Sequence, residues 1–100
     1  MIMLEIKNTL ENGTVTAIIS GRIDSTNAGE FDKGIELIDT AEKLILDVEN
    51  LEYISSAGLR VILALQKTMS KKEGMKVCNV NSDIMEVFEI TGFSDMLTIE

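Results

Sequence analysis

Two adjacent hydroxyl side chains, Ser55 and Ser56, lie between two strongly apolar stretches in the sequence NLEYISSAGLRVIL (residues 50–63). A serine at the start of a helix can cap it by accepting a hydrogen bond from a free backbone N–H group. It can also carry a phosphate, because the helix dipole and the free N–H groups stabilise an added anion. The local sequence therefore allows either serine to cap the helix that follows, and either to accept a phosphate.

Catalysis by these serines is disfavoured. The sequence ISSAG has Ile54 where the nucleophile elbow G-x-S-x-G needs its first glycine, and Leu59 stands where an S-x-x-K pair needs lysine. The chain has no histidine, so a Ser-His-Asp triad cannot be assembled. The phosphate-loop pattern is absent too. We predict that the protein is not an enzyme.

Metal and cofactor chemistry has few ligands to use. Without histidine and with the single cysteine Cys78, the chain offers almost nothing to zinc or to transition metals. A carboxylate site for magnesium or calcium stays open, although no EF-hand spacing occurs. We therefore predict no metal and no cofactor, and we expect Cys78 to be a small buried apolar residue.

The composition indicates one soluble domain over residues 1–100, with 45% hydrophobic and 26% charged residues. No apolar run approaches the ~18 residues of a membrane span, and the start has no secretory pattern. We expect a cytoplasmic protein without a membrane partner. Nine basic against seventeen acidic residues give a net charge of −8, which disfavours nucleic acid and favours a basic protein partner.

The first half of the chain predicts a hairpin and then a helix. Alternating apolar residues in 4–10 and 14–21 flank Asn12-Gly13, a strong signal for a tight turn between strands. Capping-type residues occupy 24–27, and Asn27 has capping-box spacing to Glu30. The helix that follows is expected to bury one face, formed by Ala28, Phe31, Ile35 and Ile38.

The second half alternates strands with helices. KLILDV (43–48) is typical of a strand covered on both faces, and 50–58 is expected to be a loop. A helix from Ala57 to about Lys72 and a strand in MKVCNV (75–80) follow. The last predicted helix has Asn81, Ser82 and Asp83 as possible caps and is closed by Gly92. The order is β-β-α-β-α-β-α, with MLTIE as a possible final strand. We predict an α/β fold with a small mixed sheet.

The predicted serine loop lies beyond the carboxyl end of a strand, where α/β proteins place ligands and partners. Arg60 follows Ser56 by one helical turn and could reach a phosphate there. An exposed, solvated arginine is an equally good interpretation of Arg60, and both are kept.

Three segments together resemble a known family. LILDVENLEYISSAGLRVIL (44–63) is similar to the signature of the STAS domain of bacterial anti-sigma factor antagonists. SGRIDSTNAGEF (20–31) resembles that family's second-strand exit, and VFEITGFSDMLTIE (87–100) resembles its last helix and strand. The resemblance covers roughly residues 4–99 and agrees with the predicted order of elements.

The resemblance implies a partner-switching cycle and assigns residues to it. The unmodified protein binds an anti-sigma factor that is also a serine kinase, the kinase uses ATP to phosphorylate Ser56, and a phosphatase resets it. Ser55 stands where the family usually has aspartate, which leaves Ser55 as a second candidate acceptor. Asp24 is expected beside the phosphosite. The predicted partner-binding residues are Asp24, Ser25, Thr26, Tyr53, Ser55, Ala57, Gly58, Leu59 and Arg60.

Two alternatives remain open. The domain could be a STAS-like interaction module that binds partners constitutively, without a phosphate cycle. It could also hold a small ligand or a nucleotide beside Asp24 and the serines.

Overall fold

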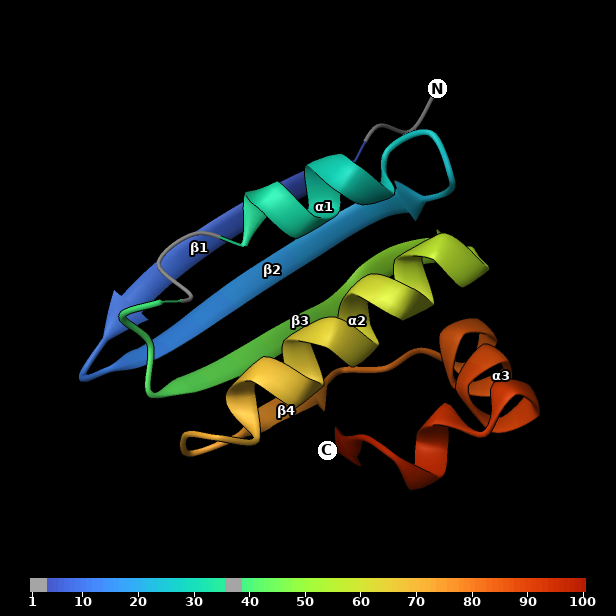
Figure 1. The fold of residues 1–100 in the computed structure, drawn as a ribbon. Helices are drawn as coiled ribbons and strands as arrows, with labels where there is room; N and C mark the ends of the chain where they lie inside the picture. Colours follow the sequence, from blue (N-terminus) through green and yellow to red (C-terminus); the bar gives the residue numbers. More distant parts are fainter. Residues whose placement is uncertain (1–3, 36–38) are drawn as a thin grey trace.

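The computed structural model describes residues 4–35 and 39–100 and consists of one sheet with helices packed on it (Figure 1). The elements in chain order are β1 (Glu5–Glu11), β2 (Thr14–Ile23), α1 (Ala28–Gly34), β3 (Lys43–Ile54), α2 (Ser56–Met69), β4 (Met75–Cys78), α3 (Ser82–Thr91), the 3-10 helix η1 (Phe93–Asp95) and β5 (Thr98–Ile99). No helix in the described ranges is long and apolar enough to cross a membrane.

The sheet has the order β1-β2-β3-β4-β5, with β1 antiparallel to β2 and the later pairs parallel. The predicted small mixed α/β sheet is confirmed, including the final strand. Helices α1 and α2 lie side by side on one face of the sheet, and α3 lies next to the end of β3 (Figure 1). Parallel neighbours require such crossovers, and their strand ends meet at one edge of the sheet.

The hairpin between β1 and β2 forms where the sequence predicts it. Asn12 and Gly13 both have positive φ, of 52° and 80°. This is the backbone of a tight turn that matches the twist of the two strands, and asparagine and glycine adopt it at low cost. The turn fixes the pairing of Glu11 with Thr14. It thereby sets which face of β2 enters the core.

The core lies between the sheet and its helices, and β3 contributes only alternate residues to it. Leu44, Leu46 and Val48 are fully buried, while Ile45 and Asp47 between them are partly exposed. The prediction that this strand is covered on both faces is therefore wrong. An uninterrupted apolar run can also arise in a strand whose second face is only half covered.

Strand β3 continues to Ile54, so the predicted loop over residues 50–58 is wrong. Its pairing with β2 shifts register between Ile18 and Ser20 and again between Gly21 and Arg22. Such bulges let a polar segment stay in the sheet while the strand changes direction. As a result Leu51 and Ile54 still enter the core, and the strand delivers its end directly to α2.

The helix ends agree in part with the sequence. Asn81 caps α3 by accepting the N–H of Ile84 at 3.0 Å, and Gly92 ends it with φ of 82°, as predicted. Helix α2 ends at Met69, before the predicted Lys72. Asn27 precedes α1 but its side chain makes no capping bond, so the predicted capping box is wrong. Phe31 is buried as predicted, whereas Ile38 lies outside the described residues.

Candidate functional site

The junction between β3 and α2 consists of a single residue, Ser55. Its backbone is extended, with φ of −88° and ψ of 173°, and its Oγ accepts the N–H of Gly58 at 3.4 Å. Its own N–H donates to the carbonyl of Ile23 at 2.8 Å, which ties the junction to the end of β2. Ser55 is therefore the helix cap, one of the two roles open to it, and its hydroxyl is already in use.

Ser56 is the first residue of α2, and its side chain is exposed. Within the described residues its Oγ has no hydrogen-bond partner. The N–H groups of Ser55 and Gly58 have acceptors, which leaves those of Ser56 and Ala57 without a protein acceptor in the same part of the chain. A free hydroxyl, two free N–H groups and the positive end of a 14-residue helix are thus together.

Gly58 allows the helix to start this close to the sheet. A Cβ atom on Gly58 would lie 2.7 Å from Ile23 Cγ2 and 2.7 Å from Ile54 Cγ1. Both contacts are with buried side chains at the ends of β2 and β3. The glycine in the sequence SSAGL is therefore required by packing between the helix and the two strand ends.

Gly58 and Leu59 do not offer a surface to a partner. Gly58 is buried and Leu59 is only 5% exposed, with its side chain in the core. Their burial gives no support to the prediction that they contact a partner directly, because the helix turns these positions toward the sheet. They position Ser56 and Ala57, of which Ala57 is half-buried, and Arg60 at the surface.

The exit of β2 lies beside this junction. Ile23 pairs with Ile54, so Asp24 and Ser55 each follow a matched pair of parallel strand residues. Asp24 Oδ1 accepts the N–H of Thr26 at 2.9 Å and its hydroxyl at 2.6 Å. Asp24 is therefore adjacent to the serine junction, as expected, and its turn is held by short hydrogen bonds.

These bonds control the charge of Asp24. The hydroxyl of Thr26 is the largest influence, and with the N–H of the same residue it holds the pKa of Asp24 below its ordinary value. The nearby guanidinium of Arg22 acts weakly in the same direction. Asp24 therefore keeps its negative charge to a lower pH than an ordinary aspartate does.

Asn27 closes the turn from the other side. Its Oδ1 accepts the N–H of Asp24 at 2.8 Å, and its Nδ2 donates to the carbonyl of Arg22 at 2.9 Å. This explains why the predicted capping bond of Asn27 does not form: the amide is used before the helix starts. Ser25 and Thr26 are exposed at the tip of the turn.

Tyr53 and Arg22 form a pair that the sequence does not predict. They are register partners on β2 and β3, and the guanidinium carbon of Arg22 lies 4.4 Å from the centre of the Tyr53 ring. Tyr53 is 41% exposed. Sequence patterns cannot predict this contact between two strands, because it depends on the second register shift in the pairing of β2 with β3.

Arg60 is exposed and makes no ion pair within the part of the chain that the structure describes. Its position one turn after Ser56 suits a later contact with an anion there, and it equally fits a solvated arginine. Both interpretations of Arg60 therefore stand.

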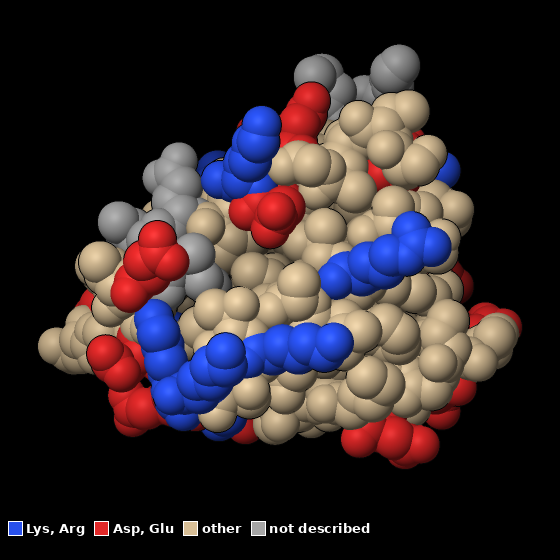
Figure 2. Space-filling model, in the orientation of Figure 1, with Lys and Arg blue, Asp and Glu red and all other residues tan. Residues whose placement is uncertain are grey.

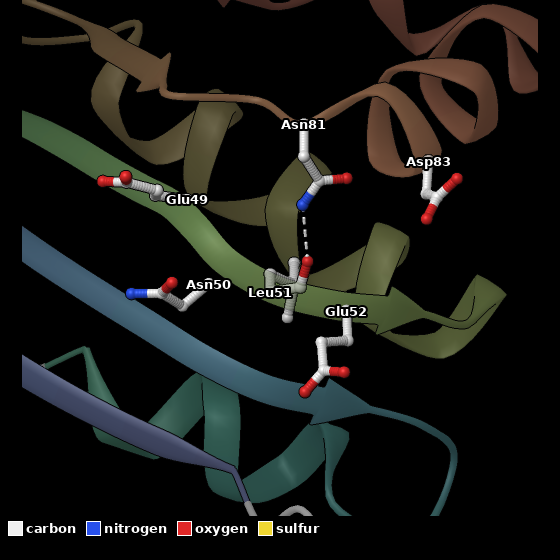
Figure 3. A pocket seen from close by; sticks show the side chains of 6 residues that line it. All are labelled: Glu49, Asn50, Leu51, Glu52, Asn81 and Asp83. Atoms are coloured by element: carbon white, nitrogen blue, oxygen red, sulfur yellow. Dashed lines mark hydrogen bonds between the residues drawn. The ribbon is translucent and has the colours of Figure 1, made fainter.

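A hollow of about 330 Å³ lies beside the second half of β3, before the junction with α2 (Figure 3). Its lining residues are Glu49, Asn50, Leu51, Glu52, Asn81 and Asp83. Asn81 Nδ2 donates to the carbonyl of Leu51 at 2.7 Å, which connects the start of α3 to the bulged strand. The sequence does not predict this hollow, because its pattern places residues 50–58 in a loop and not in the strand. No group of side chains in residues 4–35 and 39–100 is arranged to hold a metal ion.

Cys78 is partly exposed, so its prediction as a small buried residue is wrong. It lies at the end of β4, opposite Asp47. Partial burial is the largest influence on this thiol, and with the carboxylates of Asp47 and Glu100 it raises the pKa of Cys78. The reactive thiolate is therefore disfavoured.

Comparison with known proteins gives a consistent result. Residues 5–100 match the model of the STAS domain family. The chain is 34% identical over 91 residues to the BtrV protein of Bordetella bronchiseptica, which is named provisionally as an anti-sigma factor antagonist; the match covers 88% of this chain and 78% of BtrV.

Solved structures agree on the fold. An anti-sigma factor antagonist from Mycobacterium paratuberculosis superposes with a TM-score of 0.86 at 20% identity, covering 97% of this chain and 85% of that one. The Bacillus cell fate determinant SpoIIAA in its phosphorylated form superposes with a TM-score of 0.71 at 17% identity, covering 98% and 91%.

Proposed function

This chain belongs to the STAS domain family, and we propose that it acts as an anti-sigma factor antagonist whose docking is controlled by phosphorylation of Ser56. The names of its relatives support the coarser part of this proposal, antagonism of an anti-sigma factor. The finer part, a phosphate cycle at Ser56 with a kinase and a phosphatase as partners, is argued from the site.

The observation that carries the proposal is the free hydroxyl of Ser56 at the start of α2. A kinase must reach the acceptor oxygen with its nucleotide, and an exposed side chain without an internal hydrogen bond permits this. Ser55 is less suited, because its hydroxyl caps the helix and it is half-buried. Modification of Ser55 would remove the cap that starts α2.

The chemical step is a phosphoryl transfer. The kinase moves the γ-phosphoryl group of ATP to Ser56 Oγ, the hydroxyl loses its proton, and ADP is released. The phosphatase later uses water to cleave the phosphate ester and restores the hydroxyl. In this chain, the N–H groups of Ser56 and Ala57 and the side chain of Arg60 are the groups placed to stabilise the new anion.

The phosphate acts on docking locally. It adds roughly −1.5 to −2 units of charge, which is a small change for a chain of net charge −8. Repulsion between whole molecules therefore does not explain release of the partner. A dianion at the centre of a dehydrated contact does, because an unpaired buried charge costs several kcal/mol.

The docking surface that we propose surrounds Ser56. Its exposed or half-buried members are Asp24, Ser25, Thr26, Tyr53, Ala57 and Arg60. Ser55 supports this surface by capping α2. Gly58 and Leu59 support it by packing α2 against the sheet. We place the cycle in the cytoplasm, with an anti-sigma factor that is also a serine kinase and a phosphatase as partners, and without nucleic acid or a membrane.

The proposal is tested by incubating the protein with its cognate kinase and ATP and mapping the phosphate by peptide mass spectrometry. We expect one phosphate, on Ser56, and none in the Ser56→Ala variant. The matched control is Ser55→Ala, which leaves the acceptor in place and is expected to be phosphorylated. A phosphate found on Ser25 or Ser55 in place of Ser56 would refute the assignment.

The same experiment distinguishes the phosphorylation-controlled antagonist from the alternative, a constitutive interaction module without a phosphate cycle. A protein that binds the anti-sigma factor but is never phosphorylated by it would be an interaction module without a switch. In that case Ser56→Ala and the wild type would bind the partner equally, with or without ATP.

A further inference from the structure

The outer surface of α2 carries positive charge that the rest of the chain lacks. Residues 55–72 contain four basic side chains and no acidic one, whereas the other residues contain five basic and seventeen acidic ones. Arg60 and Lys67 are exposed and seven residues apart, which is two helical turns, so they lie on one face. Lys71 follows in the turn just beyond the end of α2, and Figure 2 shows basic side chains over α2, with most acidic ones toward the edges of this view.

These charges are not used inside the molecule. In the described residues the one ion pair joins Lys76 to Glu100, on β4 and at the end of the chain. Lys72 is different, because its Nζ donates to the carbonyls of Asp39 and Ala41 and so fixes a connection. We therefore define the basic stripe as Arg60, Lys67 and Lys71.

The opposite charge gathers on the other side of the sheet. The hollow of about 330 Å³ is lined by the carboxylates of Glu49, Glu52 and Asp83 and by no basic residue. These three residues are exposed. Figure 3 views this hollow with α2 behind β3, whereas Figure 1 has α2 in front of β3, so the hollow opens away from the basic stripe.

The hollow exists because the two strands differ in length. Pairing of β3 with β4 ends at Asp47 and Cys78, while β3 continues to Ile54. Beyond that point the described chain has no strand on this side of β3, and Asn81 at the start of α3 donates to the carbonyl of Leu51. The acidic side chains thus line the place where β4 stops.

We propose that the basic stripe of one molecule docks on the acidic hollow of a second copy. The spacing is compatible: Arg60 and Lys67 are separated by about 10 Å along the helix, and Glu49 and Glu52 by about 10 Å along the strand. Because the two surfaces lie on opposite sides of the sheet, the contact is head-to-tail and leaves a free stripe and a free hollow at the ends. It needs no phosphate on Ser56.

The association is weak and sensitive to salt. Two copies of net charge −8 repel each other at long range, so attraction acts only where stripe and hollow meet. We expect a reversible increase of the weight-average mass above the 11.0 kDa of the monomer as the protein concentration rises toward about 1 mM. Addition of about 0.5 M salt should return the mass to that of the monomer.

Sedimentation velocity with two double variants tests this directly. Lys67→Gln/Lys71→Gln neutralises two of the three stripe residues and Glu49→Gln/Glu52→Gln neutralises two of the three carboxylates of the hollow, so each variant alone should remain a monomer. Mixed in equal amounts they should form a heterodimer of twice the 11.0 kDa monomer mass, because one variant keeps the stripe and the other keeps the hollow. The heterodimer cannot grow further, since neither remaining surface has a partner.

The control for net charge is Lys7→Gln/Lys33→Gln, which makes the same charge change at exposed positions on β1 and α1. It should associate at least tenfold more strongly than Lys67→Gln/Lys71→Gln, and circular dichroism should show all variants folded. Equal association of these two variants would overturn the proposal. So would a mixture that stays monomeric, or a monomeric wild type that binds phosphatidylserine vesicles through the stripe.

Discussion

The exits of β2 and β3 are neighbours with similar residues but different use of their polar groups. At the β2 exit, the side chains of Asp24, Thr26 and Asn27 bond to one another or to the backbone of the same turn. At the β3 exit, Ser55 caps α2 while Ser56 keeps a free hydroxyl. Residue type alone does not distinguish the two exits. Ser56 is the better candidate because its hydroxyl, unlike the polar side chains at the β2 exit, makes no hydrogen bond within the described residues.

Ser25 tests this reasoning, since it too is exposed. It lies beside the carboxylate of Asp24, which the turn keeps ionised, and three residues before α1 begins. A phosphate there would meet a negative charge and would not be at the start of a helix. Ser56 has a helix start and Arg60 one turn away, so the β3 exit is the better place for an anion.

The largest effect should come from closing the space under the β3 exit. In Gly58→Val, the added atoms collide with Ile23 and Ile54, and we expect a loss of about 1–3 kcal/mol in the free energy of unfolding. The matched control is Gly29→Ala in α1, where an added Cβ meets nothing within 4 Å. It should stabilise the protein by about 0.5–1 kcal/mol. Urea unfolding measures both, and a neutral Gly58→Val would contradict the packing argument.

A smaller effect should separate the two serines. Ser55→Ala removes the cap of α2 and should cost about 1 kcal/mol of unfolding free energy. Ser56→Ala should change it by less than about 0.5 kcal/mol, because the hydroxyl of Ser56 supports no internal bond. Chemical denaturation of the two variants provides the comparison. If Ser56→Ala is the more destabilising of the two, the roles assigned to these serines are reversed.

The smallest effect should appear at the β2 exit as a change in titration. Thr26→Val removes the hydroxyl that most lowers the pKa of Asp24, so this pKa should rise toward its ordinary value. A depressed folded-state pKa adds stability above the unfolded value, and that stability is lost as the pH falls through the folded pKa. The variant should therefore lose part of this contribution at neutral pH and show a weaker acid dependence. NMR titration of Asp24 checks the direction, and an unchanged pKa would show that other groups set it.

Much of the fold could be predicted because its signals are local. The turn at Asn12-Gly13, the cap at Asn81 and the glycine end of α3 depend on residues close in sequence, and all are found where they were expected. The length of β3 could not be predicted in this way. Its polar second half stays in the sheet through two register shifts against β2, which depend on the partner strand.

In the candidate site, too, the features set by local sequence could be predicted, whereas those set by packing between distant elements could not. Ser56 at the start of a helix and Asp24 beside it were indicated by the sequence and its resemblance, and the structure places both at neighbouring strand ends. The burial of Leu59 and the contact of Arg22 with Tyr53 were not indicated. Both depend on how α2 and β3 are oriented, which periodicity alone leaves undetermined by about one residue.

The central claim is that charge at position 56, and not merely near it, controls docking. Calorimetric titration of the cognate anti-sigma factor with Ser56→Ala, Ser56→Asp and Ser55→Asp measures this most directly. Aspartate caps a helix as well as serine does, so Ser55→Asp adds the same charge one residue away while keeping α2 intact. We expect near wild-type affinity for Ser56→Ala and Ser55→Asp, and a loss of at least tenfold for Ser56→Asp. Equal affinity of the two aspartate variants would contradict the account.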